Sequence, residues 1–138
     1  TVDVLLASDD PHRILIVAVG ATVQMALAAA ELAARAEQPI MVVDPRWIAP
    51  LPNELIDLAR ESAAVLTVED NTRTGGVGSR LSQLLRDANV DVPVRDCGLP
   101  HAFLEHGKRS DIQQAAGLSV AAINHHLTQL RAVVTSHH

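Results

Sequence analysis

Aromatic side chains are almost absent from this chain of 138 residues, which has one tryptophan (Trp47), one phenylalanine (Phe103) and no tyrosine. Proteins that bind single-stranded nucleic acid stack its bases on exposed aromatic side chains, so this composition argues against that class and against an aromatic sugar site. Basic residues are also few, with 11 Lys and Arg against 16 Asp and Glu and a net charge of −5. We therefore expect no nucleic-acid partner.

Cysteine and long apolar segments are scarce as well. The single cysteine, Cys97, cannot form an internal disulfide, so we expect a buried structural thiol and a reducing, cytoplasmic setting. No apolar run approaches the roughly 20 residues that span a bilayer, and no signal peptide is visible. These features predict no membrane partner.

The residues at the two ends of the chain bear on its origin. Residue 1 is Thr rather than Met, so we expect residues 1–138 to be a single domain that is a fragment of a longer chain. Residues 135–138 are expected to be a disordered tail or the remnant of a tag, and we leave His137 and His138 out of all site arguments.

What the chain does contain is an alternation of apolar strands and amphipathic helices, with 48% hydrophobic residues. This order predicts an α/β fold of three layers, α/β/α, with a five-stranded, mostly parallel sheet. Strands are predicted over residues 2–6, 14–19, 39–43, 64–68 and 92–96. Helices are predicted over residues 22–36, 54–61, from about 77 to 88, from 110 to a stop at Gly117, and from a cap at Ser119 to about 134.

Charged side chains gather where predicted strands end. Asp44 and Arg46 follow one strand, and Glu69 and Asn71 follow another. Since the carboxyl ends of parallel strands meet at one edge of a sheet, we predict that these four residues cluster there. An ion pair among Asp44, Arg46 and Glu69 at a domain or subunit contact is favoured over a metal or acid–base site, which needs more ligands at recurring spacing.

A glycine-rich loop with Gly75, Gly76 and Gly78 follows the predicted strand at 64–68 and opens a helix. Backbone N–H groups at such a place can bind phosphate. The loop matches neither the dinucleotide fingerprint nor the P-loop, so we favour a tight turn with at least one glycine at positive φ.

The remaining reactive side chains form no complete catalytic set. His101, His106, His125 and His126 do not fall at the i, i+4 spacing of a helical metal site, and surface or capping roles are favoured. We assign no catalytic, cofactor-binding or metal-binding residue in this chain.

Three segments, in order, resemble the C-terminal domain of the transketolase superfamily. These are VDPRWIAPL at 43–51, VLTVEDN at 65–71 followed by GGVGS at 75–79, and GLPHAFLEHG at 98–107. The third segment, with Arg109 after it, is similar to the family of 1-deoxy-D-xylulose-5-phosphate synthases, although His101 replaces an acidic residue and Leu104 an isoleucine. The resemblance extends from about residue 15 to 130.

The resemblance implies a much longer parent enzyme and a sheet whose first strand, 2–6, is antiparallel. Such a parent condenses pyruvate with glyceraldehyde 3-phosphate, releases carbon dioxide, and supplies isoprenoid, thiamine and pyridoxal synthesis. Its thiamine diphosphate and magnesium bind between its other two domains. This domain would pack on those domains and support a homodimer, and the fragment alone would be inactive.

Contact residues for that packing are then expected at the strand ends. Candidates are Asp44, Arg46, Trp47, Glu69, Asn71, Gly75, Gly76 and Gly78. The helix at 22–36 also has more apolar positions than one sheet-facing stripe requires. Two alternatives stay open: the end domain of a 2-oxoacid dehydrogenase β subunit that docks on its acyltransferase core, and a separate flavodoxin-like or Rossmann-like nucleotide-binding protein.

Overall fold

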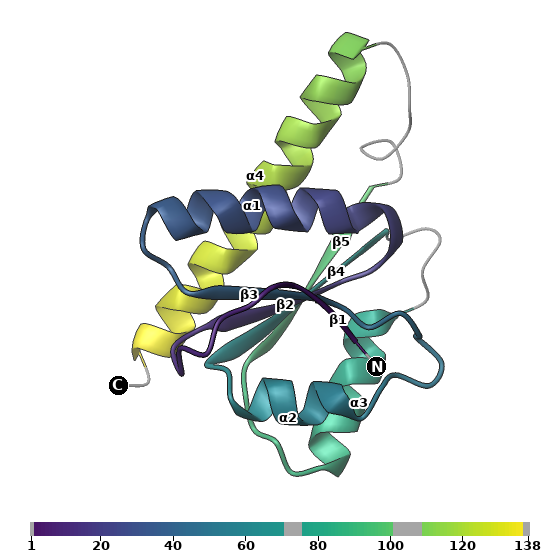
Figure 1. The fold of residues 1–138 in the computed structure, drawn as a ribbon, viewed down its shortest axis with the longest axis vertical. Helices are drawn as coiled ribbons and strands as arrows, with labels where there is room; N and C mark the ends of the chain where they lie inside the picture. Colours follow the sequence, from purple (N-terminus) through teal and green to yellow (C-terminus); the bar gives the residue numbers. More distant parts are fainter. Residues whose placement is uncertain (1, 71–75, 101–108, 137–138) are drawn as a thin grey trace.

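A computed structural model describes residues 2–70, 76–100 and 109–136 (Figure 1). Five strands form one sheet in the order β1-β3-β2-β4-β5. β1 pairs antiparallel with β3, while the β2–β3, β2–β4 and β4–β5 pairs are parallel. The predicted mixed sheet with an antiparallel first strand is confirmed. The strands are β1 (Asp3–Leu6), β2 (Ile14–Ala18), β3 (Ile40–Asp44), β4 (Ala64–Asp70) and β5 (Val94–Leu99).

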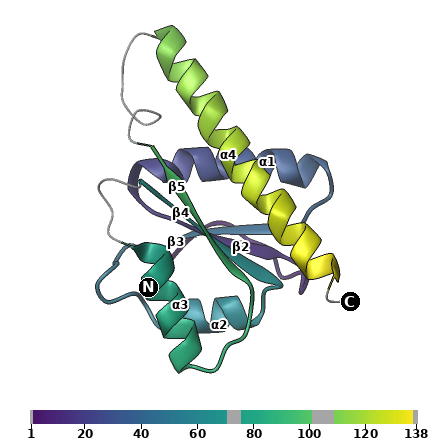
Figure 2. The same cartoon turned by 180° about the vertical axis from the view of Figure 1, so that it is seen from behind.

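The helices cover both faces of this sheet, which confirms the three-layer prediction. Figures 1 and 2 show α1 and α4 on one face and α2 and α3 on the other. The helices are α1 (Val23–Arg35), which follows a single 3-10 turn at Gly20–Thr22, α2 (Glu54–Arg60), α3 (Val77–Asp87) and α4 (Arg109–Ser136). No helix within the described ranges is long and apolar enough to span a bilayer.

The central strand β2 explains why its sequence shows no polar alternation. Ile14 and Ile16 pack into the core under α1 and α4, whereas Leu15 and Val17 pack into the core above α2 and α3. All four side chains are fully buried. A strand covered on both faces has no solvent side on which a polar residue is favoured.

The two predicted C-terminal helices are one continuous helix, α4, so the predicted stop at Gly117 is wrong. A glycine inside a helix costs about 1 kcal/mol relative to alanine, which packing of the following turns on α1 and the sheet outweighs. Ser119 is not a cap: it is buried within α4, and its hydroxyl has no hydrogen-bond partner among the described residues.

Two strands extend beyond their predicted ends. β4 continues through Asp70, so Glu69 and Asp70 belong to the strand and not to the loop after it. β5 spans Val94–Leu99 and lies at the sheet edge, directly after Pro93. The edge position was predicted because proline lacks the N–H that an inner strand needs.

Candidate contact surface at the strand ends

Asp44 and Glu69 lie at the same edge of the sheet. Asp44 ends β3 and Glu69 is the penultimate residue of β4, and both strands run parallel to β2, which lies between them. The shared edge was predicted from the order of the strands. Asn71 and Gly75, which were predicted to lie nearby, are outside the described residues.

Arg46 is held in a left-handed backbone conformation with φ of 68°. This costs a non-glycine residue on the order of 1 kcal/mol, and the Asp44 carboxylate offsets part of it by accepting the Arg46 backbone N–H at 2.9 Å. The guanidinium lies 3.3 Å from the carboxylate of Asp3. The predicted ion pair of Arg46 with Asp44 and Glu69 is therefore wrong, because the antiparallel β1 places Asp3 opposite Asp44.

Trp47 follows this strained residue and leaves 69% of its surface exposed. Large apolar side chains on the neighbouring edge strand are exposed too, with Val4 at 49% and Leu5 at 41%. Exposed apolar area on a small domain is typical of a contact surface. Among the described residues, Trp47 belongs to neither of the two hydrophobic core clusters.

Glu69 stabilises the fold of the domain and is not part of its exposed surface. Its side chain is buried, and one carboxylate oxygen accepts the backbone N–H of Val77, the first residue of α3, at 2.7 Å. Burial raises the pKa of Glu69 and the negative charge of Asp96 adds to this, against the opposing effect of the Val77 N–H. The carboxyl group thus fixes the start of α3 to the end of β4.

Two glycines at this helix start have structural roles. Gly76 has a φ of 66°, which confirms that the loop contains a glycine at positive φ. A Cβ on Gly78 would lie 2.8 Å from Cγ of Asp96 and 3.0 Å from Oγ1 of Thr67. The Thr67 hydroxyl donates a hydrogen bond to the Asp96 carboxylate at 2.6 Å. Gly78 therefore allows α3 to approach the sheet closely.

The same contacts argue against a phosphate cradle. The carboxylate of Glu69 already occupies the first amide of α3, and the carboxylate of Asp96 lies against Gly78. A bound phosphate would replace one of these groups and face the other as a like charge. The structural interpretation of the loop is the better one.

Replacing Glu69 with glutamine should make the domain's stability less dependent on pH. Because the folded-state pKa of Glu69 is raised, the folded chain keeps this proton over a pH range above 4.5 in which the unfolded chain has lost it. The free energy of unfolding therefore falls as the pH rises through that range. Glutamine keeps an acceptor for the Val77 N–H but has no charge. At neutral pH we expect the Glu69→Gln chain to have a free energy of unfolding equal to or greater than that of the unsubstituted chain. Urea denaturation at a series of pH values measures it.

Alanine is the control at this position. Glu69→Ala leaves the Val77 N–H without its acceptor, so we expect a loss of about 1 to 3 kcal/mol at every pH. If glutamine loses as much as alanine at neutral pH, burial does not disfavour the ionised carboxylate.

Among the described residues, Cys97, His125 and His126 do not form a reactive site at the surface. Burial, with the charge of Asp96, raises the pKa of Cys97 to about 11, so the thiol is protonated at neutral pH, and its predicted burial is confirmed. His126 accepts a hydrogen bond from the Arg95 guanidinium, with 2.6 Å between Nδ1 and Nε. Burial first, then the charges of Arg95 and His125, lowers the pKa of His126. His101 and His106 are outside the described residues.

Three or more potential metal ligands do not gather anywhere among residues 2–70, 76–100 and 109–136. The polar groups at the strand ends bond to one another and to the backbone, so their arrangement suits packing better than proton transfer.

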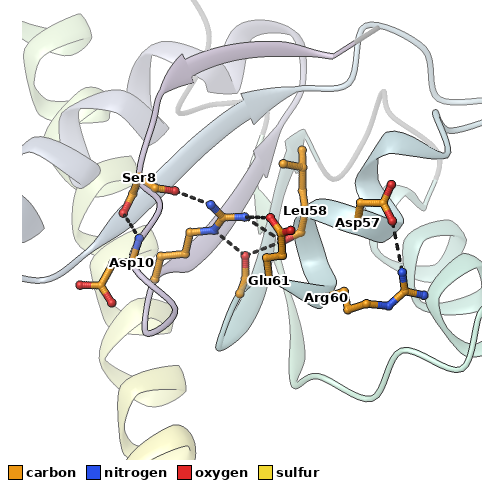
Figure 3. A network of polar contacts seen from close by, with 8 residues as sticks. Ser8, Asp10, Asp57, Leu58, Arg60 and Glu61 are labelled. Carbon is orange, nitrogen blue, oxygen red and sulfur yellow. Dashed lines mark hydrogen bonds and ion pairs between the residues drawn. The ribbon is translucent and has the colours of Figure 1, made fainter.

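The sequence analysis missed a buried polar network that is centred on Arg13. This arginine is 4% exposed, and its guanidinium donates to Ser62 Oγ at 2.9 Å, to the Leu58 carbonyl at 3.1 Å and to the Ser8 carbonyl. Glu61 adds an ion pair at 3.9 Å (Figure 3, with Ser8, Leu58 and Glu61 labelled). The only signal in the sequence is an arginine directly before the apolar run of β2, which does not reveal its partners about 50 residues away.

Comparison with known families identifies related chains. The family model described as transketolase, C-terminal domain, matches residues 5–123. A 1-deoxy-D-xylulose-5-phosphate synthase from Frankia casuarinae is 50% identical over 121 residues, which cover 86% of this chain and 18% of the relative. One from Rhodococcus jostii is 45% identical over 127 residues, which cover 92% and 20%. This chain therefore spans about a fifth of the length of these relatives.

A solved structure shows the same fold. The chain of a "split gene transketolase, inactive beta4 tetramer" superposes with a TM-score of 0.68 at 30% identity, covering 93% of this chain and 42% of that one.

Proposed function

The chain belongs to the transketolase C-terminal domain family, and we propose that it is the C-terminal domain of a 1-deoxy-D-xylulose-5-phosphate synthase. The parent enzyme would condense pyruvate with glyceraldehyde 3-phosphate to give 1-deoxy-D-xylulose 5-phosphate and carbon dioxide. In this proposal the domain is not catalytic by itself. It packs against the other domains of its chain and supports a homodimer in the cytoplasm.

The observation that carries this role is that some residues at the strand ends are buried inside the domain while Trp47 is exposed. Glu69 and Gly78 are engaged inside the domain, where they fix α3. Trp47 is held outward beside the strained Arg46 and is largely exposed. A large aromatic side chain presented in this way is typical of the anchor of a protein–protein contact.

Residues 2–70, 76–100 and 109–136 offer no set of donors that suits thiamine diphosphate or magnesium. A diphosphate needs free amide donors or cations, and the α3 N-terminus is already occupied by a carboxylate, with Asp96 beside it. Magnesium prefers a site with carboxylate and carbonyl oxygens arranged around one point, and no such group is found within the described ranges. We therefore propose that both are held by the parent's other domains.

The isolated chain should not bind thiamine diphosphate. Titration calorimetry with thiamine diphosphate and magnesium, at ligand concentrations up to the millimolar range, is expected to give no saturable heat, whereas the full-length parent should bind under the same conditions. Saturable binding at micromolar concentration by the isolated chain would contradict the assignment to a non-catalytic domain.

A further inference from the structure

A hydrogen bond between side chains joins the long helix α4 to the edge strand β5. The Arg95 guanidinium on β5 donates from Nε to Nδ1 of His126 on α4, with 2.6 Å between the two nitrogens. Arginine is always charged and can only donate, so the Nδ1 atom that accepts this hydrogen bond must itself carry no proton. The bond therefore exists only while the His126 ring is neutral.

Protonation of His126 turns this attractive contact into a repulsive one. A protonated imidazole has an N–H group at both nitrogens, so it has no lone pair left to accept the Arg95 N–H. The two side chains then become cations that face each other at the distance of a hydrogen bond. Within the described ranges no carboxylate forms an ion pair with Arg95, so none neutralises this repulsion directly.

The other charged groups that act on His126 do not remove this effect. Burial first, then the charges of Arg95 and of the neighbouring His125, lowers the pKa of His126, and only Asp96 acts in the opposite direction. Asp96 follows Arg95 on β5, so its side chain points to the opposite face of the sheet. There its carboxylate accepts the Thr67 hydroxyl at 2.6 Å.

We propose that the contact between Arg95 and His126 is a pH-sensitive link, which holds α4 on β5 at neutral pH and opens when His126 is protonated in mildly acidic solution. The inference goes beyond the function proposed above and does not depend on it. β5 is the strand at which such a link matters most, because it pairs with β4 alone. On the face where α4 packs, this helix covers it.

The remaining contacts of α4 do not depend on this histidine. Ile123 and Leu127 are buried in the core between the helix and the sheet. Near the end of the helix, the Arg131 guanidinium donates to the backbone carbonyls of His12 and Pro39 at 2.7 and 2.8 Å. Opening of the link therefore loosens the middle of α4 from β5 without releasing the helix from the sheet.

The stability that this link provides is lost as the pH falls. Because the pKa of His126 is lower in the folded chain than its usual value of 6.5, the unfolded chain binds this proton first. The free energy of unfolding therefore decreases as the pH falls below about 6.5. Glu69 has the opposite effect, because its folded-state pKa is raised. A variant in which only His126 is replaced separates the two contributions.

Urea denaturation at pH 7 and at pH 5 compares the unsubstituted chain with His126→Gln. Glutamine offers a carbonyl oxygen to the Arg95 N–H but cannot be protonated. From pH 7 to pH 5 we expect the unfolding equilibrium constant of the unsubstituted chain to rise about three-fold or more beyond the change in the variant. His125→Gln is the matched control: it removes the adjacent, exposed histidine of the same helix and should keep most of the pH dependence.

Nuclear magnetic resonance of the unsubstituted chain tests the link without any substitution. We expect Nδ1 of His126 to carry no proton at neutral pH and the ring to titrate with a midpoint below 6.5. As the ring is protonated, the backbone amides of α4 around His126 should lose several-fold more protection from hydrogen exchange than those of α2 and α3.

Four results would each overturn the pH-sensitive link. These are a proton on Nδ1 of His126 at neutral pH, a titration midpoint at or above 6.5, and an equal pH dependence of unfolding in His126→Gln and the unsubstituted chain. The fourth is an equal loss of protection in α4, α2 and α3, because it would mean that protonation destabilises the whole domain and does not open one contact.

Discussion

Replacing Arg13 with methionine is expected to lower the free energy of unfolding by about 3 kcal/mol or more. Methionine replaces the aliphatic part of the arginine side chain but donates no hydrogen bond. The carbonyl oxygens of Ser8 and Leu58 would lose the guanidinium, and the hydroxyl of Ser62 would lose its donor. Urea denaturation of the isolated chain measures the loss.

Arg60→Met is the matched control because it removes an arginine from the same region of the fold. The Arg60 guanidinium lies 3.2 Å from Asp57, and both side chains are exposed. Exposed pairs of this kind contribute about 0 to 1 kcal/mol, so the change should stay within that range. Equal losses of unfolding free energy for Arg13→Met and Arg60→Met would show that burial does not determine how much the Arg13 network contributes to stability.

The double-sided burial of β2 and the edge position of β5 could be predicted because their determinants are local. The β2 run is apolar at every position, and only a strand covered on both faces tolerates this pattern. Pro93 likewise marked the edge strand that follows it. Such signals depend on a residue's own chemistry and on its immediate neighbours in the chain.

The structure differs from the predictions where it depends on packing between segments that are far apart in the chain. Gly117 was expected to end a helix on its intrinsic preference, but the helix continues because the residues after it pack on α1 and the sheet. Arg46 pairs with Asp3, which lies far from it in the chain, and only the register of β1 against β3 brings the two together. The partners of Arg13 could not be identified for the same reason.

For the candidate site, the sequence predicted that Asp44 and Glu69 lie at one edge of the sheet, as observed, but not which side chains there are buried. Glu69 was predicted to lie at a contact surface, and the structure shows it buried against the start of α3. Gly78 was grouped with contact residues, and its close neighbours are Asp96 and Thr67 of the same domain. Trp47 is exposed at the strand ends, and its role in a contact with other domains stays a prediction.

Replacing Trp47 with alanine in the full-length synthase proposed above should weaken domain packing or dimerisation by about 2 kcal/mol or more, as truncation of a buried aromatic anchor does. Activity should fall indirectly, through stability, with little change in substrate preference. In the isolated chain the same substitution removes a side chain that is 69% exposed, so the free energy of unfolding should change by no more than about 0.5 kcal/mol.

The most direct test of the proposed packing role is the thermal unfolding of Trp47→Ala in both contexts, the isolated chain and the full-length synthase. A contact domain predicts an unchanged Tm for the isolated chain and a lowered Tm, with weaker dimerisation, for the full-length enzyme. Equal loss in both would make Trp47 part of the domain's own stability. Unchanged Tm and dimerisation in the full-length enzyme with an altered substrate preference would instead place Trp47 in a substrate site and contradict the account.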